Sequence, residues 1–61
     1  MCEANAYIIE NDEPRLIMEA VDTIEPSDEG LKLVNIFGEQ KFVKASIHAL
    51  SLVDHKVYLK P

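Results

Sequence analysis

Clusters of turn-forming residues divide this sequence into short segments, and their spacing constrains the fold more than any other feature. The clusters are Asn11-Asp12-Glu13-Pro14, Pro26-Ser27-Asp28-Glu29-Gly30, Gly38-Glu39 and Asp54-His55. Asn, Asp and Gly favour turns for backbone reasons, and Pro has no N–H to donate. The 61 residues also include eleven Val and Ile, which favour strands. The pattern predicts about five to seven short strands joined by turns of about two to five residues.

The segments between the turns carry strand-like patterns of differing clarity. Strands are expected over Glu3–Glu10, over Leu31–Phe37, with Leu31 and Leu33 on one face, and around Val57 and Leu59 near the end of the chain.

The clearest alternation begins at Gln40. It predicts that Val43, Ala45, Ile47 and Ala49 face inward while the residues between them face out. After Leu50 the alternation shifts by one residue, which predicts a bend or a β-bulge.

The segment Arg15–Ile24 fits two structures. Its apolar residues suit one face of a helix, whereas Pro14 at the expected end of a turn and the β-branched Val21, Thr23 and Ile24 favour strands. We favour strands, and the sequence leaves the choice open.

A short chain of this kind is expected to form a single all-β domain over residues 1–61. Its apolar content of 48% is enough for a compact core. An antiparallel meander of this size should curl into a small barrel or a strongly twisted sheet, because closure removes exposed strand edges.

Composition excludes several classes of function. Eleven acidic and six basic residues give a formal charge of −5, which opposes nucleic-acid binding. We find neither a phosphate-binding loop nor a catalytic constellation, so no enzyme is expected. No long apolar run or leader suggests a membrane or an export role, which favours a cytoplasmic protein with a reduced cysteine. His48 and His55 are interpreted as surface histidines, since neither has a second histidine at metal-ligand spacing.

Cys2 is the candidate for chemistry because of its position. Removal of Met1, as is usual before a small residue, would leave its α-amine beside its thiol, with ordinary pKa values of about 8 and about 8.5. The two groups can chelate one metal ion, and two chains can supply four ligands. The backbone amide of Cys2 or Glu3 is a further nitrogen donor. Planar N and S ligands favour Ni(II) or Cu(II) over zinc, whereas the competing interpretation of a lone cysteine is a small buried hydrophobe.

Four parts of the sequence resemble the CooT family of small nickel-binding proteins, which are associated with maturation of the nickel enzyme carbon monoxide dehydrogenase. These are Met1-Cys2-Glu3-Ala4-Asn5-Ala6-Tyr7, Met18-Glu19-Ala20-Val21-Asp22-Thr23-Ile24-Glu25-Pro26, Leu33-Val34-Asn35-Ile36-Phe37-Gly38-Glu39 and Leu52-Val53-Asp54-His55-Lys56-Val57-Tyr58-Leu59. The resemblance implies a small SH3-like or Sm-like β-barrel homodimer that binds one Ni(II) through the cysteine matching Cys2. It also implies a metallochaperone whose partner is a nickel enzyme or its maturation machinery.

Two other functions are alternatives. One is a small RNA-binding barrel, in which Tyr7 and Tyr58 could stack on bases while Phe37 and Phe42 are expected in the core. The other is a metal-independent interaction module that offers a sheet edge to a partner.

Overall fold

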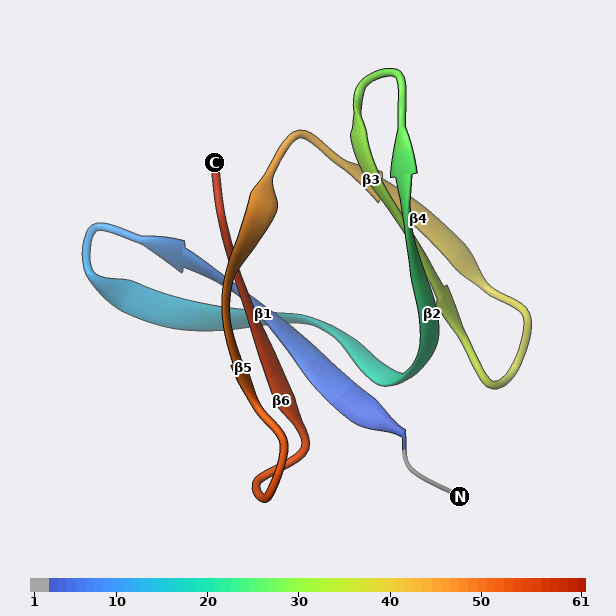
Figure 1. The fold of residues 1–61 in the computed structure, drawn as a ribbon, viewed down its shortest axis with the longest axis horizontal. Coiled ribbons are helices and arrows are strands. Elements are labelled where there is room, and N and C mark those ends of the chain that lie inside the picture. The colour runs from blue at the N-terminus through green and yellow to red at the C-terminus, as the bar shows by residue number, and fades with distance from the viewer. Residues whose placement is uncertain (1–2) are drawn as a thin grey trace.

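The computed structural model describes residues 3–61, and over this range the chain consists of six strands without a helix (Figure 1). The strands are β1 (Ala4–Glu10), β2 (Glu13–Ser27), β3 (Gly30–Asn35), β4 (Gln40–Val43), β5 (Ser46–Ser51) and β6 (Lys56–Lys60). The all-β fold and the strand number are therefore confirmed. Arg15–Ile24, the segment left open above, lies within one strand, β2. Nothing in the part of the chain that the structure describes forms a helix able to cross a membrane.

The six strands form one sheet in the order β4-β3-β2-β1-β6-β5. All neighbours pair antiparallel except β1 and β6, which run parallel from Asn5↔Lys56 to Ile8↔Leu59. The purely antiparallel arrangement expected from the sequence is wrong at this one pair. The hairpin of β5 and β6 returns beside the first strand, where the rings of Tyr7 and Tyr58 stack with centroids 5.6 Å apart.

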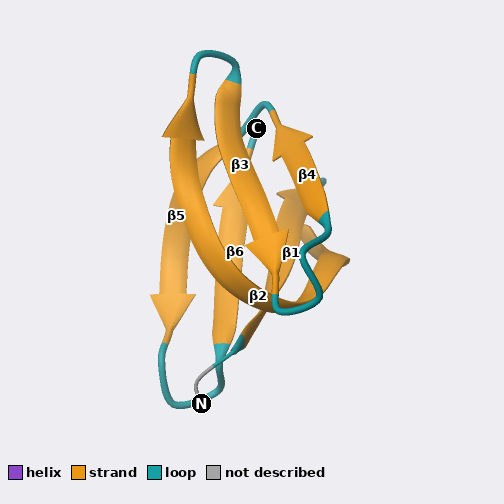
Figure 2. Cartoon of the chain, turned by 90° about the vertical axis from the view of Figure 1, so that its right-hand side faces the viewer, coloured by secondary structure: helices purple, strands orange, loops and turns teal. Residues whose placement is uncertain are grey.

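The sheet curls without closing into a barrel. Its two edge strands, β4 and β5, are not neighbours in the hydrogen-bonding order of the described chain. The chain nevertheless brings one end of each edge strand close to the other, because only Lys44 and Ala45 connect β4 to β5. A chain spans at most about 3.6 Å per residue. The end of β4 and the start of β5 therefore lie within about 11 Å of each other. The strongly twisted sheet, one of the two expected shapes, is what the structure shows (Figure 2).

β2 belongs to both halves of the sheet. Its first part pairs with β1 and its last part, from Val21 to Ser27, pairs with β3. Between them Ala20 has a positive φ of 56°, and the register shifts on both sides of it. Asn5 Oδ1 accepts a hydrogen bond from Ala20 N at 3.2 Å, and Ala20 O accepts one from Ile36 N at 2.9 Å. Both backbone groups at this bend are therefore satisfied.

The core is small and central. Its buried apolar residues are Ala6, Met18, Val21, Leu33, Val57 and Leu59. The inward positions predicted at Val43 and Ala45 are confirmed, since both pack against this core. Leu31, expected to share a face with the buried Leu33, also packs against it.

Two of the predicted inward positions, Ile47 and Ala49, are wrong, since both are exposed. The bulge expected after Leu50 lies between Ile47 and Ala49, where the register of β5 against β6 shifts. Because a bulge changes which face the following residues occupy, the alternation read along the sequence does not carry through this edge strand.

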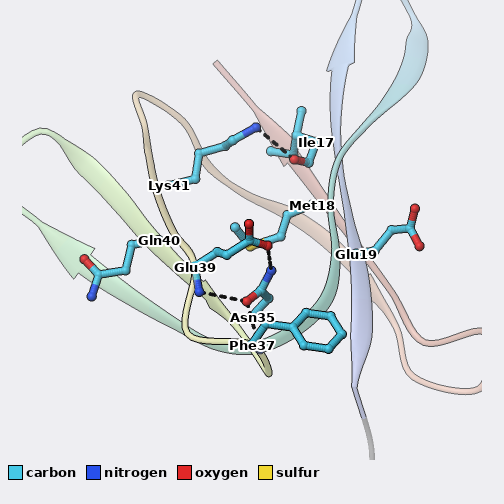
Figure 3. Close-up of a pocket in the computed structure, with 8 residues that line it drawn as sticks. All are labelled: Ile17, Met18, Glu19, Asn35, Phe37, Glu39, Gln40 and Lys41. Atoms are coloured by element: carbon cyan, nitrogen blue, oxygen red, sulfur yellow. Dashed lines mark hydrogen bonds between the residues drawn. The ribbon is translucent and has the colours of Figure 1, made fainter.

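The turn between β3 and β4 is organised by one side chain. Asn35 is only 7% exposed, and its Oδ1 accepts hydrogen bonds from Phe37 N at 3.0 Å and Glu39 N at 2.9 Å. Its Nδ2 donates to Glu39 Oε1 at 2.7 Å (Figure 3). Gly38, with a φ of 85°, donates its N–H to Asn35 O at 3.0 Å. The turn holds Phe37 outside the core, and Phe42 in β4 is also exposed, so the expectation that both are core residues is wrong.

We expect Ala20→Gly to leave the free energy of unfolding unchanged or to raise it by up to about 1 kcal/mol. The left-handed conformation costs a residue with a Cβ about 1–2 kcal/mol, which offsets the greater freedom of glycine in the unfolded chain. Ala49→Gly is the matched control: Ala49 is an exposed strand alanine without a positive φ, so glycine there should cost about 0.5–1 kcal/mol. Urea unfolding measures the free energy of unfolding of both variants. Equal losses of stability in the two would contradict the backbone strain assigned to Ala20.

The Asn35–Glu39 hydrogen bond predicts that a second substitution can restore the stability lost in the first. Asn35→Asp removes the Nδ2 donor and places two carboxylates together, so it should cost about 1–3 kcal/mol at neutral pH. Glu39→Gln keeps the Oε1 acceptor and should cost less than about 1 kcal/mol. In the double variant the amide introduced at position 39 can donate to the carboxylate introduced at position 35, which should restore most of the loss. Urea unfolding of the four proteins tests this, and additive losses would show that the pair does not interact.

Candidate functional site

The end of the chain that carries the predicted metal ligands enters the fold beside the turn between β5 and β6. Cys2 lies outside the residues that the structure describes. Glu3, the first described residue, is exposed and directly precedes β1. Asn5 N donates a hydrogen bond to His55 O at 2.9 Å, which fixes the start of β1 against that turn (Figure 2).

A largely apolar pocket of about 350 Å³ lies next to Glu3. It is lined by Glu3, Ala4, Leu50, Ser51, Leu52, His55, Lys56 and Val57. Leu52 in the β5–β6 turn is 79% exposed and its neighbour Val53 is 90% exposed. We call the exposed apolar residues Ile47, Leu50, Leu52 and Val53 the β5 apolar surface. Two of them, Leu50 and Leu52, line this pocket together with Glu3 and Ala4.

The two histidines are surface residues, as the sequence indicated. His48 is exposed in β5, and His55 is exposed in the turn, where its φ is 56°. Among residues 3–61, no three His, Cys, Asp or Glu side chains gather closely enough to hold a metal ion. Within this described range neither histidine belongs to a ligand cluster, and a metal site involving Cys2 and Glu3 stays a prediction.

A second pocket, which sequence reasoning missed, lies between β2 and the β3–β4 turn. It measures about 470 Å³ and is lined by Ile17, Met18, Glu19, Asn35, Phe37, Glu39, Gln40 and Lys41 (Figure 3). We call it the Phe37 pocket. Phe37 is 75% exposed, and the Lys41 Nζ donates to Ile17 O at 3.0 Å.

The sequence carried a signal for the geometry of this pocket. Asn at the end of an apolar strand, followed three residues later by Gly, favours a turn in which the Asn side chain binds the backbone. Asn35 and Gly38 have this spacing. An apolar Phe37 inside such a turn cannot also reach the core, because the turn directs it outward.

Comparison with known proteins identifies the family. Residues 1–60 match the family described as CO dehydrogenase accessory protein CooT. A crystal structure of a protein assigned to CooT from Carboxydothermus hydrogenoformans is 49% identical, with a TM-score of 0.91 over 97% of this chain and 95% of that chain. No curated protein matches. Because the family consists of accessory proteins, the expectation of a non-enzymatic protein is confirmed. The resemblance seen in the sequence is therefore correct, and the chain belongs to the CooT family.

Proposed function

We propose that this protein carries nickel for the maturation of carbon monoxide dehydrogenase and binds the metal through Cys2. The observation that carries the proposal is a cysteine at the second position of a member of this accessory family. The metal is cargo here: the protein would hold Ni(II) and release it to the enzyme or to its maturation machinery. A thiolate ligand requires a reduced cysteine, which suits a cytoplasmic protein.

Each of two chains would supply two ligand atoms, both from Cys2. Once Met1 is removed, the Cys2 thiolate and α-amine form a five-membered chelate, and the backbone amide of Glu3 is a further nitrogen donor. Two copies then complete a set of nitrogen and sulfur ligands around one nickel ion. Mixed N and S donors in a plane suit Ni(II), whereas a tetrahedral arrangement would suit zinc.

The β5 apolar surface supports a homodimer. Ile47 is 50% exposed and Leu50 is 56% exposed, while Leu52 and Val53 are more exposed still. Full burial of such a side chain is worth about 1.5–3 kcal/mol, so covering this surface with a second copy would be favourable. The surface adjoins Glu3, so a two-fold contact here would bring two N-termini together. The proposed stoichiometry is one nickel ion per dimer.

Nickel titration of three forms of the protein tests the ligands. We expect tight binding to protein with a native N-terminus, no comparable binding to Cys2→Ser, and weak binding when extra residues precede Cys2. The thiolate is lost in the second form, and the α-amine becomes an amide in the third. Calorimetry gives affinity and stoichiometry, and light scattering of the same samples gives the number of chains. Equal affinity in all three forms would contradict the Cys2 site.

Variants at Glu3 separate the nitrogen donors. Glu3→Pro removes the backbone N–H that would have to ionise, whereas Glu3→Ala keeps it and removes only the side chain. Weaker nickel binding in the proline variant alone would assign the Glu3 amide as a ligand. If Cys2→Ser is the one form that loses nickel binding, the thiolate binds the metal without help from the α-amine or the Glu3 amide.

Nickel affinity should fall on acidification. The α-amine and thiol have ordinary pKa values of about 8 and about 8.5, so below neutral pH both must lose a proton before they bind. Each such group weakens binding about tenfold per pH unit. Competition titrations between about pH 8 and about pH 6 measure this slope, with a chelator of known proton affinity as reference. An affinity independent of pH would exclude both groups as ligands.

A further inference from the structure

We propose that the Phe37 pocket is a docking site for an arginine side chain on a basic segment of a partner protein. The proposal goes beyond nickel carriage and does not depend on it, because the described residues that line the pocket come from β2, the β3–β4 turn and the start of β4 and do not include Glu3.

The first argument is that the protein holds in place the backbone that carries a solvent-exposed aromatic ring. Phe37 is 75% exposed, yet three hydrogen bonds from the Asn35 side chain organise its turn. In one of these bonds the Phe37 N–H itself donates to Asn35 Oδ1. Because the backbone at Phe37 is already ordered, a partner that covers the ring has to order only the side chain. Aromatic side chains are typical anchors of protein interfaces.

The second argument is the charge around the ring. Glu39 and Glu19 both line the pocket, and the bond from Asn35 Nδ2 engages Oε1 of Glu39. Lys41 is the one cationic side chain among the lining residues, and its ammonium donates to Ile17 O at 3.0 Å. Figure 3 shows Lys41 extending toward Ile17 and away from the Phe37 ring. Two carboxylates therefore outnumber the one ammonium group among the lining residues, and the formal charge of −5 adds a long-range attraction for a basic partner.

These features together favour arginine over other groups. Its planar guanidinium stacks on an aromatic ring and donates in a fork to a carboxylate, whereas the lysine ammonium is a strongly hydrated point charge. Ile17 and Met18 add apolar wall to the pocket, against which the aliphatic stem of an arginine can lie. A protein segment supplies neighbouring residues that free arginine lacks, so we expect the segment to bind more tightly.

The test is a titration of metal-free, ¹⁵N-labelled protein followed by amide chemical shifts. The probes are a blocked five-residue peptide with two arginines, the same peptide with two lysines, and free arginine amide. We expect saturable shifts confined to residues 17–19 and 35–41. The arginine peptide should bind about threefold or more tightly than either other probe, given the bidentate and stacked geometry open to guanidinium.

Two variants and one control make the result specific. Phe37→Ala and Glu39→Gln should each weaken the arginine peptide about tenfold, as expected for central interface groups. Glu39→Gln keeps the acceptor for Asn35, so it tests charge without opening the turn. Glu29→Gln makes the same charge change in the exposed β2–β3 turn and should leave binding unchanged. Urea unfolding confirms that each variant is folded.

Three outcomes would overturn the proposal. In the first, shifts spread over acidic turns and are unaffected by Phe37→Ala, which would indicate non-specific attraction. In the second, the lysine and arginine peptides bind equally. In the third, Phe37→Ala lowers the molecular mass in light scattering without peptide, which would show that a second copy of the chain occupies the pocket. None of these outcomes depends on whether Cys2 binds nickel.

Discussion

The left-handed bend at Ala20 allows one strand to serve both halves of the sheet. Without this bend β2 could pair along its length with β1 or with β3, but not with each in turn. The two halves of the curled sheet would then no longer share a strand. The bend places a Cβ in an unfavourable conformation, and the surrounding hydrogen bonds compensate for this cost. Asn5 binds the Ala20 N–H, and Ile36 binds the Ala20 carbonyl. A backbone group buried here without a partner would be more costly than the strain itself.

The same bend connects the two candidate functional surfaces. Asn5 lies three positions after Cys2 and also donates its backbone N–H to His55 O beside the apolar pocket near Glu3. Ile36 begins the turn that presents Phe37. The segments that lead to the proposed metal-binding end and to the Phe37 pocket are therefore both hydrogen-bonded to Ala20, although they are different parts of the chain. A chain with six buried apolar residues in its described range has little interior for a site, and both surfaces accordingly lie at turns and strand ends.

Local patterns predicted much of the fold because turns and strands depend on nearby residues. Asn11 and Asp12 both have positive φ in the two-residue turn between β1 and β2, as turn chemistry favours. Leu33 and Leu59 are buried because each occupies an inward position of a paired strand. The alternation failed at Ala49, which follows a bulge in an edge strand, and at Phe37, where the Asn35 side chain holds the turn. Both failures arise from hydrogen bonds that hydrophobic alternation does not register.

The sequence by itself determined the all-β class, the position of most turns and the family, since these follow from residue order and local backbone preference. It also singled out Cys2, because its place next to the N-terminus is a matter of covalent chemistry. Only the tertiary structure decided that β1 and β6 run parallel, that β4 and β5 do not pair, and that the Phe37 pocket exists. These features bring together residues far apart in the chain, such as Met18 and Asn35 around one pocket and Tyr7 and Tyr58 across the β1–β6 pair. Local backbone preference does not specify such long-range pairing.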